Sequence, residues 1–152
     1  AELREYHKAE NLWEHVEPDV EPALAALRAR GLRLVVVSNA NGRLQHLFDR
    51  LQLTRWFDHV MDSHDWRVEK PDPRLFHLAL EHAGADPAHT VHVGDLYHVD
   101  VMGARRAGLR DAVLFDMANL YGEVDCPRVG SLAALVEWID RTSGNQTLNR
   151  VP

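Results

Sequence analysis

The chain has 152 residues, of which 45% are hydrophobic and 26% are charged, and this composition is typical of one globular domain with a full core. Its formal net charge of −6 argues against nucleic acid or an anionic membrane as the main partner. The single cysteine excludes an internal disulfide, and neither a signal peptide nor an apolar run of about 18 residues is visible, so we expect a cytoplasmic protein.

Helices and strands are predicted to alternate along the chain. An amphipathic helix is expected over residues 1–16, and a second helix from Val20 to Arg30 ends at Gly31. The apolar, β-branched run Leu32–Val37 is typical of a parallel strand that is covered on both faces. Later helices are predicted over Gly42–Leu51, from Pro71–Pro73 to Gly84, over Val99–Ala107 and after the cap Ser131, and later strands over His59–Asp62, Val91–Val93 and Ala112–Phe115. This alternation predicts an α/β fold, a Rossmann-like three-layer sandwich with a parallel sheet.

Acidic residues and a histidine follow the strand Val91–Val93. Gly94 and Asp95 turn the chain, and a short helix ending at Gly108 comes next. Asp95, His98 and Asp100 are therefore expected beyond the carboxyl end of the strand, where open α/β sheets bind ligands. Two carboxylates and an imidazole suit a divalent cation, although acidic residues also favour a helix N-terminus without any ligand.

Two other loops place polar residues at strand ends. Ser38 and Asn39 precede a helix, and a hydroxyl together with backbone N–H groups at such a position suits phosphate oxygens. Lys70 is a point charge near the start of the helix that follows Pro71. Taken singly, these residues are better explained as turn, cap or solvated residues.

Taken in order, the three segments resemble the second, third and fourth motifs of the haloacid dehalogenase-like (HAD) hydrolase superfamily. The matching stretches are Val35–Asn39, Glu69–Pro73 and Val93–Gly108, and the resemblance extends over about Leu12–Ile139. By this resemblance the chain would have the HAD-like fold and would act on a small-molecule phosphate ester.

The resemblance also implies roles for single residues. Ser38 would bind a phosphoryl oxygen, and Asn39 would shape the phosphate pocket. Lys70 would neutralise the phosphate charge, and Asp95, helped by Asp100, would hold a divalent metal, so that Lys70, Asp95 and Asp100 would be catalytic. Apart from the resemblance, His98 could add an imidazole ligand to these carboxylates, which would make Zn²⁺ or Mn²⁺ as suitable as Mg²⁺. His92 alternates away from Asp95 along its strand and is expected in the core.

The first superfamily motif, an N-terminal strand ending in Asp-x-Asp, has no counterpart before Leu32. The resemblance implies that residues 1–17 are a remnant of a helical cap, residues 18–141 the α/β core and residues 142–152 a polar tail. The missing strand would be central, between Leu32–Val37 and Val91–Val93. Either these two strands pair with each other or another copy of the chain fills the slot, and we predict a homodimer in which the exposed edges or the N-terminal helices are exchanged.

Two functions remain open at this stage. The first is a metal-dependent phosphoester hydrolase, of phosphatase or phosphodiesterase type, in which metal-activated water replaces the aspartyl nucleophile. The alternative is a catalytically inactive, truncated HAD-like fragment or an interaction module. Haloacid dehalogenation ranks last because it needs the same missing aspartate. Asp116 follows the strand Ala112–Phe115 and is expected to be an ordinary strand-end residue rather than a substitute nucleophile.

Overall fold

The computed structural model describes residues 15–144, in which short parallel strands alternate with helices. The first half contains α2 (Val20–Ala29), β1 (Val35–Ser38), α3 (Leu44–Arg50), the single turn η1 (Thr54–Trp56), β2 (His59–Asp62), α4 (Ser63–Trp66) and α5 (Pro73–Ala83). The second half contains the turn η2 (Pro87–His89), β3 (Val91–Gly94), the π-helical segment η3 (Tyr97–Val101), α6 (Met102–Arg106), β4 (Asp111–Phe115), β5 (Arg128–Val129) and α7 (Leu132–Gly144). No helix within residues 15–144 is long and apolar enough to cross a lipid bilayer.

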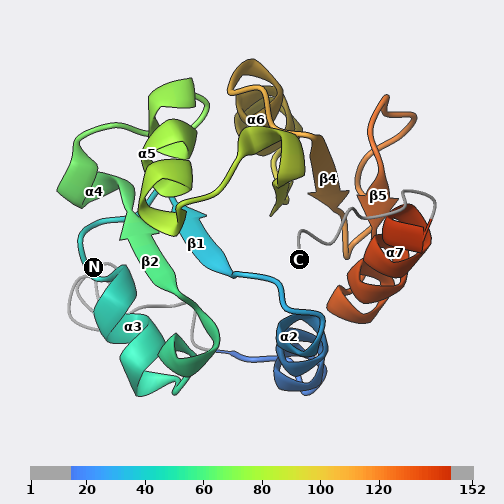
Figure 1. Ribbon diagram of the computed structural model, residues 1–152, viewed down its shortest axis with the longest axis horizontal. Coiled ribbons are helices and arrows are strands. Elements are labelled where there is room, and N and C mark those ends of the chain that lie inside the picture. Colours follow the sequence, from blue (N-terminus) through green and yellow to red (C-terminus); the bar gives the residue numbers. More distant parts are fainter. Residues whose placement is uncertain (1–14, 145–152) are drawn as a thin grey trace, which may run out of the picture.

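The strands form two separate parallel sheets. β1 pairs with β2, and β3, β4 and β5 pair in that order. Figure 1 shows β1 and β2 on the left of the molecule and β4 and β5 on the right. The predicted α/β fold with parallel strands is therefore confirmed. β1 and β3 do not pair with each other, and no strand within residues 15–144 lies hydrogen-bonded between them.

Helices cover both sides of the strands, with α5 and α6 on one side and α2, α3 and α7 on the other (Figure 1). β4 shows why, because its successive side chains are buried in different clusters. Leu114 packs with Phe76 and Val101 of the α5 side, whereas Val113 packs with Leu135 of α7. The core thus forms on both faces of the second sheet.

Two helices of the same layer are tied together by an ion pair. The guanidinium of Arg30, at the end of α2, donates to both carboxylate oxygens of Asp140 in α7, at 2.6 Å each. This two-pronged geometry suits arginine and carboxylate groups. It links the element before the first sheet to the helix that covers the second.

Most predicted elements are found, with shifted ends. The strand His59–Asp62 is confirmed residue for residue, and Ser131 Oγ accepts the N–H of Ala134 at 3.1 Å as the predicted cap. β1 begins later than predicted, because the N–H of Leu34 donates to the side chain of Asp58 rather than to a strand. The short elements α4 and β5 were missed, since so few residues show no hydrophobic period.

The two ends of the chain are only partly described. The helix predicted over residues 1–16 lies almost wholly outside the described range, and residues 15–17 are not helical. At the other end α7 continues to Gly144, beyond the residue at which the polar tail was expected to begin. Asp116 is buried and accepts the N–H groups of Leu120 and Tyr121, at 2.8 and 3.1 Å, which accords with a structural strand-end residue.

Candidate functional site

Lys70, Asp100 and His92 form a buried polar cluster at the carboxyl end of β3. Lys70 Nζ lies 2.7 Å from Asp100 Oδ1, and His92 Nε2 lies 3.0 Å from the same oxygen. The side chain of Asp100 is only 2% exposed, and those of Lys70 and His92 are 11% and 12% exposed. The structure therefore brings together two of the residues that the sequence singled out and adds a third.

The charge of this cluster is fixed by its hydrogen bonds. Burial opposes ionisation of Asp100, but hydrogen bonds from His92, Lys70 and the backbone N–H of Leu96 together hold the pKa of its carboxyl far below the ordinary value. Burial lowers the pKa of His92, and its bond to Asp100 only partly opposes this. The carboxylate is thus ionised, and His92 Nε2 must donate to it because an ionised carboxylate can only accept.

The prediction that His92 turns into the core, away from the site, is only half right. Its ring is buried and packs edge-on against Phe76, with ring centroids 4.9 Å apart, but its Nε2 also reaches Asp100. Alternation along the strand contained the signal, since His92 and Gly94 are two residues apart and share a face. A Cβ built on Gly94 would lie 2.2 Å from Asp100 Cγ, so this same face carries Asp100.

Asn39 contacts the backbone of Lys70 at both hydrogen-bonding groups. Its Nδ2 donates to the carbonyl oxygen of Lys70 at 2.9 Å, and its Oδ1 accepts the N–H of Lys70 at 2.8 Å. The amide therefore fixes the segment that carries the lysine. Ser38 is the last residue of β1 and half-buried, so its hydroxyl lies at the strand end that precedes this contact.

The loop after Ser38 is held in place by two buried residues that sequence reasoning missed. Asp62 Oδ2 accepts the N–H groups of Gly42 and Leu44 at 2.7 and 3.2 Å. Ser63 Oγ accepts the N–H of Ala40 at 3.2 Å. Both residues stand at the carboxyl end of β2, which was the one available signal for them.

Asp95 and His98 make no hydrogen bond or ring contact with the side chains of the buried cluster. Both side chains are exposed, and His98 packs edge-on against Tyr97, with ring centroids 5.3 Å apart. The carbonyl oxygen of Asp95 accepts a hydrogen bond from the Tyr121 hydroxyl at 3.0 Å, whereas its carboxylate has no protein partner in the described part of the chain. The carboxylate is therefore available to a ligand.

The side chains of Asp95, His98 and Asp100 determine which metal ion this end of β3 would suit. Within residues 15–144 no three His, Cys, Asp or Glu side chains lie close enough together to form a metal site. Both oxygens of Asp100 already accept hydrogen bonds, so Asp95 is the better-placed carboxylate. One or two carboxylates, completed by waters and substrate oxygens, suit Mg²⁺, whereas Zn²⁺ commonly takes three or four protein ligands.

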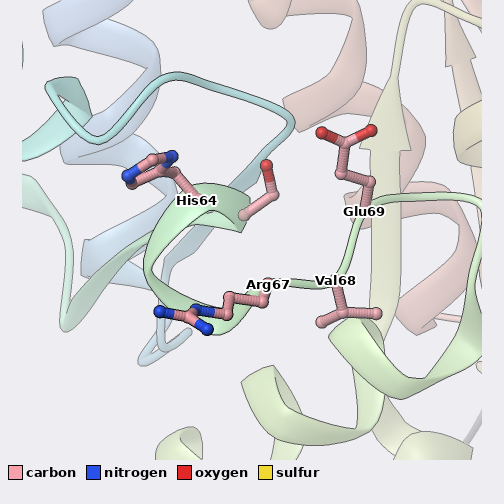
Figure 2. A pocket seen from close by; sticks show the side chains of 5 residues that line it. His64, Arg67, Val68 and Glu69 are labelled. Carbon is pink, nitrogen blue, oxygen red and sulfur yellow. The ribbon is translucent and has the colours of Figure 1, made fainter.

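A pocket of about 530 Å³ lies beside the segment that leads to Lys70. It is lined by Ser63, His64, Arg67, Val68 and Glu69. Figure 2 shows His64 and Arg67 on one side of this hollow, around the turn of α4, and Glu69 on the other. Two of the lining residues, Arg67 and Glu69, carry a charge, and Glu69 directly precedes Lys70 in the chain.

Comparison with known proteins gives the chain its family. Residues 1–108 match the model of the haloacid dehalogenase-like hydrolase family. The haloacid dehalogenase-like hydrolase domain-containing protein 3 of Bos taurus is 42% identical over 97 residues, which are 64% of this chain and 38% of that protein. The protein of the same name from Danio rerio is 35% identical over 133 residues, which are 88% of this chain and 54% of that protein. The glyceraldehyde 3-phosphate phosphatase of Methanopyrus kandleri is 35% identical over 105 residues, 68% of this chain and 45% of its own.

Solved structures agree with the fold. The HAD phosphatase from Thermococcus onnurineus matches with a TM-score of 0.78 and 28% identity, over 82% of this chain and 58% of that one. A 2-haloacid dehalogenase from Pseudomonas syringae matches with a TM-score of 0.72 and 31% identity, over 84% and 54% of the two chains. The chain thus spans between 38% and 58% of the length of these five relatives. Because the family model matches well over half of its residues, the chain belongs to the haloacid dehalogenase-like hydrolases.

Proposed function

We propose that the chain acts as a metal-dependent phosphoester hydrolase on a small-molecule phosphate ester. The observation that carries this proposal is the lysine that Asp100 and Asn39 hold at the carboxyl ends of β1 and β3. A fixed ammonium group together with a hydroxyl at a strand end suits a phosphoryl group. The phosphatase names of two relatives, from Methanopyrus kandleri and Thermococcus onnurineus, support the same class of substrate.

The chain's own residues would divide the work as follows. The Ser38 hydroxyl and the Lys70 ammonium group bind phosphoryl oxygens, and Asn39 keeps Lys70 in position. The oxygen of a water attacks phosphorus and this water gives up a proton to solvent. The bond from phosphorus to the ester oxygen breaks, and the leaving oxygen takes a proton from solvent. Water is the nucleophile in this proposal, and no carboxylate of the described residues is given that role.

The cation is assigned to the carboxylates after β3. Asp95 would hold it through its exposed carboxylate, and Asp100 or His98 would add at most one further protein donor, since no three such side chains lie together within residues 15–144. Mg²⁺ suits this donor set best, with Mn²⁺ and Zn²⁺ as the other candidates. Such an ion supplies charge neutralisation and lowers the pKa of a water bound to it.

The test is hydrolysis of aryl phosphate monoesters and diesters after the metal has been stripped and Mg²⁺, Mn²⁺ or Zn²⁺ has been added back. We expect Asp95→Ala to lower the rate of hydrolysis at least tenfold. Substitution of the residues that only support a metal's ligands already costs about 10- to 100-fold in activity. Asp86→Ala is the matched control, because Asp86 caps the distant turn η2. Equal rates for Asp95→Ala and the parent protein would eliminate the proposal.

A second candidate is a fold that has no turnover by itself and serves as a fragment or an interaction module. It is favoured by the facing edges of β1 and β3, which have no strand partner within residues 15–144. The two candidates differ in one result. The second predicts binding of inorganic phosphate without release of product from any of the esters, whichever metal is present.

We also propose that two copies of the chain associate, with exchanged elements covering the edges of β1 and β3. We expect sedimentation to show a dimer at micromolar concentration, because unpaired strand edges in a parallel sheet favour a partner. A monomer throughout that range contradicts the association and leaves the proposed chemistry untouched.

A further inference from the structure

His92 is placed to act on the candidate site without touching its substrate. It stands in β3, on the same face as Gly94, and its ring packs edge-on against Phe76 of α5. Packing alone would explain a buried aromatic ring at this place. It does not explain the hydrogen bond from Nε2 to Asp100 Oδ1 at 3.0 Å.

We propose that His92 is a positioning residue that orients Asp100 and, through Asp100, the ammonium group of Lys70. This role rests on the proposed phosphoester hydrolysis, in which Lys70 binds the phosphoryl group. His92 belongs to none of the segments that carry the resemblance to the family, since the fourth begins at Val93.

The geometry gives His92 a specific task. The carboxylate of Asp100 accepts three hydrogen bonds, from Lys70 and His92 at Oδ1 and from the N–H of Leu96 at Oδ2. The backbone N–H of Leu96 fixes one oxygen, but the plane of the carboxylate is set only when the other oxygen is fixed too. A lysine side chain is flexible and cannot do this by itself. The ring of His92 is held between β3 and α5, so it can fix this oxygen.

The position of the Asp100 carboxylate sets the direction in which the ammonium protons of Lys70 point. Asp100 Oδ1 accepts one of the three ammonium protons, so the position of this oxygen decides where the other two point. If His92 holds the oxygen, the two free protons keep one direction. Without His92 the carboxylate can rotate about its bond to Cβ, and the ammonium group follows it.

The experiment compares substitutions that separate packing from hydrogen bonding. His92→Phe keeps a ring against Phe76 and removes the donor. His92→Gln can place an amide N–H near the position of Nε2, whereas the shorter His92→Asn cannot. His77→Phe is the matched control, because His77 Nε2 also contacts an oxygen, that of Ala107 at 3.1 Å, but stands outside the site on the exposed part of α5.

In the hydrolysis assay we expect His92→Phe and His92→Asn to lower kcat by about 10- to 100-fold, the range known for residues that orient a ligand group. KM should change by less than about threefold, and His92→Gln should recover most of kcat. A purely structural role predicts that His92→Phe, which packs best, is the most active of the three. That order, or a loss as large in His77→Phe, overturns the proposal.

A second readout does not depend on turnover. Crystal structures of His92→Asn and His92→Gln should differ at Asp100, with the carboxylate rotated and Lys70 displaced only in His92→Asn. Absence of hydrolysis in the parent protein would overturn the proposed function, while these structures would still decide the role of His92. Unchanged positions of Asp100 and Lys70 in both variants overturn the inference.

Discussion

Asp100→Ala is expected to lower the free energy of unfolding by about 3 to 5 kcal/mol, the usual cost of removing one partner from a buried ion pair. The substitution leaves the Lys70 ammonium group, the His92 Nε2–H and the N–H of Leu96 without their acceptor. Urea denaturation of the two proteins measures the difference. A loss below about 1 kcal/mol would show that the pair is no more than a surface contact.

Asp125→Ala is the control for this substitution. Asp125 also pairs with a cation, Arg105, at 3.0 Å, but the side chain of Asp125 is 68% exposed. Exposed pairs contribute about 0 to 1 kcal/mol, so this variant should lie close to the parent protein. A large loss of stability in Asp100→Ala and a small one in Asp125→Ala would attribute the difference to the burial of the Asp100 ion pair.

The effect of Asp100 should also depend on pH in a defined direction. The pKa of Asp100 in the folded protein lies below the ordinary value of 3.8, so its ionised form stabilises the fold. This stabilisation is complete above the ordinary pKa and is lost as the pH falls toward the folded one. The difference between the parent protein and Asp100→Ala should therefore narrow as the pH is lowered from about 5 to about 3.

Gly94→Ala is expected to destabilise the protein by about 3 kcal/mol, at the upper end of the usual cost of overpacking. A Cβ at this position would lie 2.2 Å from Asp100 Cγ and 2.5 Å from its Oδ2. Asp100 cannot withdraw cheaply, because it is buried and three donors hold its carboxylate. Either β3 shifts or Asp100 leaves the cluster, so phosphate binding should be lost as well.

Gly122→Ala tests whether the added methyl group matters only where it has no room. Nothing lies within 4 Å of a Cβ built on Gly122, which is in an exposed loop. Its stability should stay within about 0.5 kcal/mol of the parent protein. Thermal denaturation and calorimetry with inorganic phosphate, applied to both glycine variants, give the comparison. Equal behaviour of the two variants would contradict the close approach at Gly94.

The sequence predicted, in the correct order, those helices and strands whose apolar residues recur with a helical or strand period. β2 and α5 could be predicted because their apolar residues, prolines and glycine mark both the pattern and its limits. Lys70 and Asp100 could be singled out because strand ends meet at one edge of a parallel sheet. The family resemblance, now shown by the match over residues 1–108, ordered these segments correctly.

What the sequence could not predict depends on contacts between distant segments. The pairing of Asn39 with the backbone of Lys70 joins residues 31 positions apart, and no local pattern announces it. Alternation along the strand places His92 opposite Asp95, but Asp95 already lies beyond the end of β3, so this pattern does not show which face carries the site. Pairing of β1 with β3 is one of the two outcomes that the sequence leaves open, and the hydrogen-bonding pattern of residues 15–144 excludes it, whereas the homodimer stays a prediction.

The polar chain from Asn39 through Lys70 to Asp100 has one more effect. Asn39 follows the first sheet and Asp100 follows the second, so these contacts run across a boundary that no strand pairing bridges within residues 15–144. The residues of the candidate site therefore also hold the two sheets in contact. An anion that binds at Lys70 would therefore stabilise the contact between the two sheets. Its binding should raise the melting temperature of the protein, and the rise should grow with the concentration of the anion.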